Sequence, residues 1–113
     1  MNGPEPSRGE VWFADVAGEK KRPVLIVTRD PMGRHLHSVI CAPITSTLRG
    51  ISTEVALGSE AGLKNESVAN FDNMFLLPRT QLLRLLGRAN AVQMQAVCMA
   101  AAVAIGCKPF GRV

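Results

Sequence analysis

The sequence predicts a mainly β single domain, a compact antiparallel barrel of short strands followed by one C-terminal helix. Its 113 residues, 47% hydrophobic and 19% charged, suffice for one folded domain with one small core. Six segments rich in β-forming residues follow one another at close spacing, as is typical of small barrels. The composition then changes to an uncharged apolar segment, residues 91–105, that has the length of a helix. No repeat or linker divides the chain.

The first four strands are predicted from runs of apolar and β-branched residues. They span residues 9–15, 22–28, 38–45 and 51–57. The second contains a continuous apolar run, which is expected of a central strand buried on both faces. Pro43 interrupts the third strand and suits an edge position or a bulge, because proline lacks the N–H that a ladder needs. The fourth alternates apolar and polar residues and is predicted to be half buried.

The rest of the barrel is expected from a loop at residues 58–65, a fifth strand at 67–77 and a short sixth strand at 84–89. The opening segment, residues 1–8, holds two prolines and no apolar periodicity, so we expect it to be flexible. The domain proper then spans residues 9–113, with the barrel at about 9–89.

The C-terminal segment is predicted to be a helix from Ala91 to about Ile105, with Asn90 as its N-cap and Gly106 at its end. Apart from Gln93 and Gln95 its side chains are apolar on every side. Such a helix has to be covered on more than one face. One face can pack on the barrel and the other on a second subunit, so we expect a homodimer.

The charge balance favours a polyanionic partner. The formal net charge is +4 with a pI of about 9.4, and nine of the thirteen basic residues are arginine, which grips phosphate with two parallel hydrogen bonds. Many small basic proteins nevertheless bind no nucleic acid. The cysteine count is three, with no CxxC, and Cys41 and Cys98 stand in apolar runs, which favours buried reduced thiols in a cytoplasmic protein. We expect no signal peptide, no membrane span and no cofactor.

Four motifs, in this order, carry a resemblance. They read RGEVWFAD (residues 8–15), RPVLIV (22–27), APITST (42–47) and SVANFDN (67–73), the last followed by LPRT at 77–80. Together they resemble the MazF/PemK/Kid family of bacterial toxins, over roughly residues 8–105. The resemblance implies an SH3-like barrel with a C-terminal helix, a homodimer, and metal-independent, sequence-specific cleavage of single-stranded RNA that inhibits translation and growth. It also implies a cognate antitoxin whose acidic tail covers the RNA groove.

The resemblance implies two catalytic residues, Arg22 and Thr45. Cutting RNA without a metal uses the ribose 2′-OH as nucleophile, so the site must accept its proton, stabilise charge on the phosphate and protonate the leaving 5′-oxygen. Arg22 would stabilise charge and Thr45 would contact the phosphate. Neither is a general base at neutral pH, so the base stays open, with Glu19 as one candidate. The non-catalytic alternatives are that Arg22 is a solvated arginine at the start of a strand and that the Thr45 hydroxyl stabilises a turn.

Substrate contacts are expected from residues near these two. The family pattern assigns Ser46 as a second hydroxyl donor and Asp72 and Asn73 as groove residues, although Asp72 equally suits a turn. Kid-type members carry a catalytic arginine where this chain has Asn70. Further candidates for substrate contact or for the wall of the RNA channel are Glu19, Lys20, Arg29, Arg34 and Arg49.

Alternative chemistries and functions remain open from sequence alone. His35 and His37 offer an acid and base pair, but two histidines are too few for a metal site. The gyrase-poisoning CcdB branch shares the fold and acts through a C-terminal tryptophan, whereas the single tryptophan here is Trp12. The last alternative is a non-catalytic barrel that only binds nucleic acid or protein.

Overall fold

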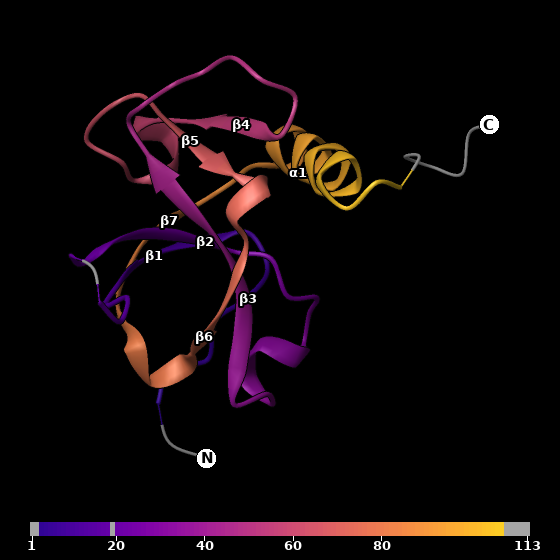
Figure 1. Ribbon diagram of the computed structural model, residues 1–113. Coiled ribbons are helices and arrows are strands. Elements are labelled where there is room, and N and C mark those ends of the chain that lie inside the picture. The colour runs from indigo at the N-terminus through magenta and orange to yellow at the C-terminus, as the bar shows by residue number, and fades with distance from the viewer. Residues whose placement is uncertain (1–2, 19, 108–113) are drawn as a thin grey trace.

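The computed structural model describes residues 3–18 and 20–107, and it confirms a curved antiparallel sheet with one C-terminal helix (Figure 1). The strands and the helix are β1 (Glu10–Ala14), β2 (Arg22–Ile26), β3 (Ser38–Thr45), β4 (Glu54–Leu57), β5 (Ser67–Asn70), β6 (Phe75–Pro78), β7 (Leu82–Arg88) and α1 (Ala91–Ala104). Four single turns of 3₁₀ helix connect them: η1 (Met32–Arg34), η2 (Ser59–Ala61), η3 (Phe71–Asn73) and η4 (Arg79–Gln81).

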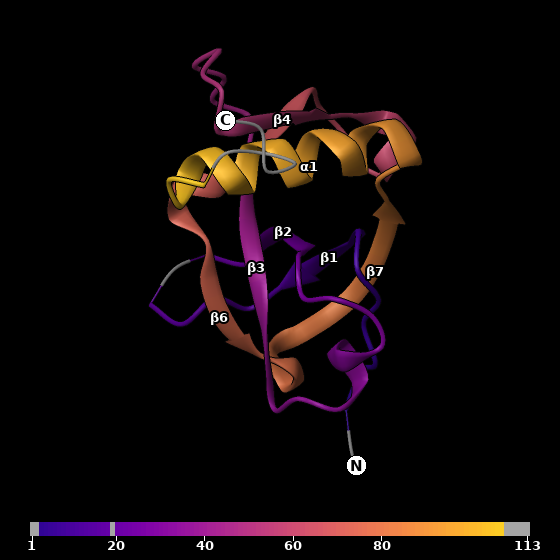
Figure 2. The same ribbon diagram turned by 90° about the vertical axis from the view of Figure 1, so that its right-hand side faces the viewer.

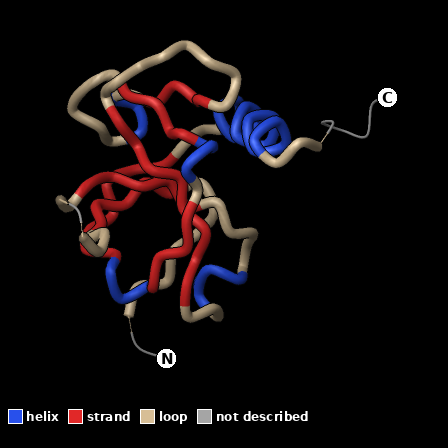
Figure 3. Tube along the Cα trace, viewed as in Figure 1, coloured by secondary structure: helices blue, strands red, loops and turns tan. Residues whose placement is uncertain are grey.

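All strand pairs are antiparallel, in the order β4-β5-β3-β2-β1-β7, and β6 pairs with the first half of β3. Figure 3 shows the strands of the lower half curling around one another, while β4 and β5 lie in the upper half beside α1. Turned by 90°, Figure 2 shows α1 lying across the top of the molecule, with β3, β6 and β7 below it. The long strand β3 therefore belongs to both halves.

The prediction of one fifth strand over residues 67–77 is wrong, because this segment forms two strands with a 3₁₀ turn between them. The Asn70 side chain accepts a hydrogen bond from the Asp72 N–H at 2.9 Å, which caps the turn at η3. Before the turn, β5 pairs with the end of β3, as in Ile44 opposite Ala69. After it, β6 pairs with the start of β3, as in Val39 opposite Leu77. The sheet has seven strands as a result.

The expectation that Pro43 marks an edge strand or a bulge is also wrong, since β3 lies inside the sheet. On one side β3 pairs continuously with β2. On its other side the pairing with β6 extends to Cys41 and the pairing with β5 begins at Ile44. Pro43 falls in the gap between these two partners, where the ladder is interrupted and a missing N–H is tolerated.

Two hydrophobic cores lie on the two faces of β2. Val24, Leu25 and Ile26 are all fully buried, which confirms a central strand covered on both sides. Leu25 belongs to the helix-side core, which contains Val11, Leu25, Ala42, Ile44, Val55, Leu57, Ala61, Leu63, Ala69, Phe71, Ala89, Val97 and Ala100. Val24 and Ile26 belong to the barrel core, which contains Ala14, Val24, Ile26, Val39, Cys41, Leu77 and Leu82.

The cysteines divide between these environments. Cys41 is buried in the barrel core, and burial raises the pKa of its thiol to about 12. Cys98 was expected to be buried as well, and that expectation is wrong because its side of α1 is exposed. There the Arg8 guanidinium donates a hydrogen bond to the Cys98 Sγ at 3.3 Å.

Helix α1 has the predicted ends. The Asn90 side chain accepts from the Gln93 N–H, and the Gln93 side chain accepts from the Asn90 N–H, each at 2.8 Å, which forms a capping box. At the other end Gly106, with φ of +81°, donates to the Val103 carbonyl while Cys107 donates to that of Ala102, the pattern of a Schellman motif. Within residues 3–18 and 20–107, no helix has the length and hydropathy needed to cross a membrane.

Two glycines bring the η2 turn directly against β7. Gly62 has φ of +88°, and a Cβ there would lie 2.0 Å from the Leu86 carbonyl oxygen. A Cβ at Gly87 would lie 2.3 Å from the Ala61 carbonyl oxygen. The two backbones are therefore in direct contact, and this contact fixes the loop that leads from η2 to β5.

The described part of the N-terminal segment, which we expected to be flexible, lies against the body of the protein. Pro6 is buried, and its carbonyl oxygen approaches Gly33 so closely that a Cβ there would clash at 2.2 Å. The buried Arg79 guanidinium donates a hydrogen bond to the Pro4 carbonyl at 2.6 Å.

Candidate active site

Arg22 and Thr45 lie beside each other at the ends of neighbouring strands. The β2–β3 register pairs Val24 with Pro43, and the same register continued towards the strand ends sets Arg22 opposite Thr45, on one face of the sheet. One guanidinium nitrogen of Arg22 donates to the Ile44 carbonyl at 3.4 Å. Because the root of Arg22 is held in a central strand, its guanidinium is oriented before any ligand arrives.

The Thr45 hydroxyl already has one role. Its oxygen accepts a hydrogen bond from the Thr47 N–H at 3.1 Å, which stabilises the turn where β3 ends. The hydroxyl proton remains available to donate. A hydroxyl whose oxygen is held by a backbone N–H is well placed to donate to an anion such as a phosphate oxygen.

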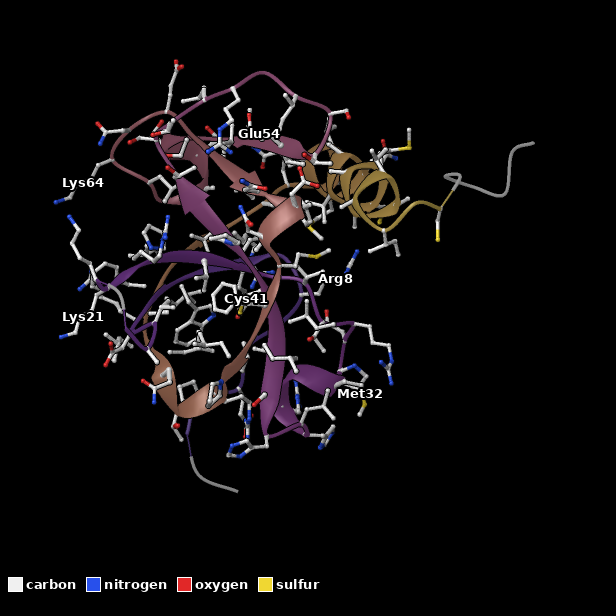
Figure 4. All side chains as sticks on the ribbon, viewed as in Figure 1. Arg8, Lys21, Met32, Cys41, Glu54 and Lys64 are labelled. Atoms are coloured by element: carbon white, nitrogen blue, oxygen red, sulfur yellow. The ribbon has the colours of Figure 1, made fainter. Side chains whose placement is uncertain are left out.

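A groove of about 830 Å³, here called the basic groove, opens on one side of this pair. It runs between the loop before β2, strand β7 and the loop from η2 to β5. It is lined by Phe13, Lys20, Lys21, Arg22, Pro23, Ile44, Thr45, Ser46, Gly62, Leu63, Lys64, Asn65, Ser67, Arg84 and Leu86. Figure 4 shows Lys21 and Lys64 on the same edge of the molecule, from opposite walls.

A second hollow of about 500 Å³, here called the amide hollow, opens on the other side of the pair. It is lined by Val16, Arg22, Pro43, Thr45, Thr47, Arg49, Asn70, Asn73 and Phe75. Arg22 and Thr45 line both cavities, so the two cavities meet at this pair. In neither cavity does a described lining residue carry a carboxylate or an imidazole.

Several of the other predicted contact residues are brought together here. Ser46 and Lys20 line the basic groove, and Arg49 and Asn73 line the amide hollow. Glu19 lies outside the described residues.

Asp72 is set apart from these contact residues. Its carboxylate accepts a hydrogen bond from the Thr53 hydroxyl at 2.7 Å, and its side chain lines neither cavity. The exposed Arg29 and Arg34, expected on the channel wall, also line neither cavity.

The histidine and tryptophan alternatives find no support in the geometry. His35 and His37 are exposed beside η1 and line neither cavity. Among the described residues, no three side chains of histidine, cysteine, aspartate or glutamate gather into a group that could hold a metal ion. Trp12 packs against the barrel core and its indole N–H donates to Glu10 at 3.0 Å, so it is a structural residue.

The far wall of the basic groove, where Phe13 and Arg84 lie, was not predicted from the sequence. The Arg84 guanidinium carbon lies 5.2 Å from the centre of the Phe13 ring there, and Lys21 and Lys64, also not predicted, line other parts of the groove. The Phe13–Arg84 pair arises from the pairing of the first and last strands. Composition and local spacing contain no signal for such a long-range pair.

Residues 7–105 match the family of PemK-like, MazF-like toxins of type II toxin-antitoxin systems. The probable endoribonuclease MazF5 of Mycobacterium tuberculosis is 36% identical over 104 residues, which cover 90% of this chain and 94% of that protein. The endoribonuclease MazF3 of the same species is 43% identical over 82 residues, which cover 73% of this chain and 80% of that protein.

Solved structures agree with these relatives. The M. tuberculosis toxin MazF-mt6 superposes with a TM-score of 0.82 at 37% identity, covering 88% of this chain and 98% of that one. A mycobacterial endoribonuclease in complex with its cognate antitoxin also superposes with a TM-score of 0.82, at 34% identity, covering 91% of this chain and 97% of that one. The chain belongs to the family of PemK-like, MazF-like toxins of type II toxin-antitoxin systems.

Proposed function

We propose that this chain is a metal-independent endoribonuclease that cuts single-stranded RNA in the cytoplasm and so inhibits translation and growth. The observation that carries the proposal is the position of Arg22 and Thr45, side by side between a basic groove and an amide-lined hollow. Membership of a toxin family whose similar members are named endoribonucleases supports the same activity.

In the proposed reaction the ribose 2′-oxygen attacks the adjacent phosphorus while the bond from phosphorus to the 5′-oxygen breaks. The 2′-OH loses a proton and the leaving 5′-oxygen gains one, so the products are a 2′,3′-cyclic phosphate and a 5′-OH. The Arg22 guanidinium stabilises the charge that builds on the phosphate oxygens, and the Thr45 hydroxyl donates to one of them. Both groups are oriented before substrate binds, so little reorganisation is needed.

We assign the general base to Glu19. Lys20 and Lys21, its neighbours in the chain, line the basic groove, and no carboxylate or imidazole of the described residues lines either cavity. An ionised carboxylate from this loop would be able to accept the 2′-OH proton.

The proposal includes a homodimer through α1. Val92, Ala96, Met99 and Val103 follow the spacing of one helical stripe, and all four are exposed. Val92 is 75% exposed, Met99 42% and Val103 44%, on a helix whose opposite side packs in the helix-side core. An apolar stripe of this kind is stabilised by a second copy of the chain. Sedimentation of Met99→Glu and Val103→Glu, beside the wild type, tests it: each introduced charge should weaken a dimer, and a fully active wild-type monomer would contradict it.

A cognate antitoxin completes the proposal. One similar structure is an endoribonuclease in complex with its cognate antitoxin. The basic groove, with its lysines and arginines, suits an acidic antitoxin segment that would compete with RNA for the same surface.

The decisive experiment incubates the purified full chain with a long mixed-sequence RNA in excess EDTA and maps the cut ends. We expect cleavage at a limited set of sites, with 2′,3′-cyclic phosphate and 5′-OH ends, and an uncut single-stranded DNA of the same sequence. DNA resists because it lacks the 2′-OH nucleophile. Loss of cutting on chelation, restored by Mg²⁺, would refute the mechanism.

A further inference from the structure

The far wall of the basic groove contains a stacked pair that the proposed cleavage chemistry does not use. Phe13 on β1 is paired with Arg84 on β7, so both side chains project from the same face of the sheet. The Arg84 guanidinium carbon lies 5.2 Å from the centre of the Phe13 ring, within the range of a cation–π contact. Arg84 is exposed and lines the groove, so a ligand in the groove can reach its guanidinium.

Four cations besides Arg22 line this groove. Lys20, Lys21, Lys64 and Arg84 line the groove, and within residues 3–18 and 20–107 none of them pairs with a carboxylate. Arg88, on the same strand as Arg84 but outside the groove, does form an ion pair with Glu10 at 3.0 Å. A cluster of like charges destabilises the folded chain slightly, so its gathering around one groove indicates an anionic ligand.

Part of the groove lining is apolar, which narrows the kind of anion that fits it. Pro23, Leu63 and Leu86 contribute to it, and the volume of about 830 Å³ lies within the range of pockets that enclose a whole small molecule. A bare inorganic anion gains nothing from apolar lining residues or from a stacking surface. A nucleotide has a flat base and a charged phosphate, and it matches both halves of this lining.

We propose that the basic groove is a nucleotide subsite next to the scissile phosphate, in which the Arg84 guanidinium, supported by Phe13, stacks on one RNA base. Lys21 and Lys64 face each other across the groove and neutralise the backbone of the same strand (Figure 4). Arg22 and Thr45 line the same groove, so RNA whose scissile phosphate lies on them continues directly into it. The inference rests on the proposed function and adds positioning residues away from the cleaved bond.

The test uses the full chain and an RNA oligonucleotide around a mapped cut site, with a 2′-deoxy sugar at the cut nucleotide so that it binds without reacting. Fluorescence anisotropy at several salt concentrations gives Kd and its salt dependence. Arg84→Lys keeps the positive charge but removes the planar guanidinium. Phe13→Leu keeps an apolar side chain but removes the aromatic ring. We expect each to raise Kd about 5- to 100-fold, the scale of one lost base stack, without changing the salt slope.

Two further variants separate charge from stacking. Lys64→Gln should lower the magnitude of the salt slope by about 0.7, the value for one lost contact to a single-strand phosphate, with a smaller effect on affinity. Arg34→Lys, on the exposed η1 turn outside both cavities, is the matched control and should bind as the wild type does. Thermal unfolding midpoints of all variants show whether each is folded.

The outcomes distinguish this inference from the proposed function. Wild-type affinity in both Arg84→Lys and Phe13→Leu, in a protein that still cleaves RNA, overturns the stacking subsite alone. Loss of affinity in Arg84→Gln but not in Arg84→Lys also overturns it, because the wall would then act through charge only. A wild-type chain that neither binds nor cuts RNA overturns both.

Discussion

The two cavities that meet at Arg22 and Thr45 differ in their chemistry. The basic groove is the larger, with four cations besides Arg22 and an aromatic ring on its wall, whereas the amide hollow offers two asparagines, threonine hydroxyls and Arg49. Cations grip any RNA backbone, and amides read the hydrogen-bonding edges of bases. This difference suggests that affinity and base choice can be supplied by two separate cavities that meet at the proposed cleavage centre.

The largest effect is expected where the cavities meet. Arg22→Ala and Thr45→Ala should each lower the rate of RNA cleavage about 10²-fold or more, because each removes a group that acts on the developing phosphate charge. Single-turnover cleavage of the mapped oligonucleotide measures the loss, and near-identical thermal melts verify folding. Replacing both His35 and His37 with alanine is the control. Near-wild-type cleavage by Arg22→Ala would place the cleavage centre elsewhere and break the comparison.

A smaller and more selective effect is expected in the amide hollow. Asn73 is exposed there, whereas Asn70 is buried and uses its side-chain oxygen to cap η3. Asn73→Ala should therefore relax the preference for one base beside the cut by about 5- to 100-fold, the scale of one bidentate base contact. Competition between matched oligonucleotides that differ at single positions measures this preference. A uniform loss on every sequence would assign Asn73 to the backbone instead.

The smallest effect on cleavage is expected outside both cavities, at Asp72, which precedes Asn73 in the chain. Asp72→Asn weakens the hydrogen bond from Thr53 and should lower the free energy of unfolding by about 1 kcal/mol, with little change in cleavage rate. Urea unfolding and the cleavage assay, run side by side, separate the two quantities. If cleavage falls far more than stability, the Asp72 carboxylate contacts RNA as the family resemblance implied.

Local patterns in the sequence predicted the elements whose formation is local. The apolar run of β2 and the Asn90 cap of α1 act within a few residues, and the structure agrees with both. The break in residues 67–77 was missed because the Asn70 side chain competes with the ladder, and a strand-like composition does not reveal that competition. The Phe13–Arg84 wall depends on which strands pair, and short windows of sequence do not encode the pairing.

Most site residues that were predicted from the sequence lie in or beside the family motifs. Arg22, Thr45, Ser46, Arg49 and Asn73 line the two cavities. The family pattern also suggested Asp72, and the structure gives its carboxylate to Thr53. The channel arginines were expected from their charge alone, and of these Arg49 lines the amide hollow whereas the exposed Arg29 and Arg34 line neither cavity.

The contact of Gly62 and Gly87 between η2 and β7 bears on how such a toxin can change its target. The contact is made by main-chain atoms, so it does not depend on the identity of the side chains around it. Lys64, Asn65 and Arg84 project from the two joined segments, are exposed and belong to neither core. Substitutions at these three positions leave the glycine contact and both cores untouched, so the lining of the basic groove can change while the scaffold is kept.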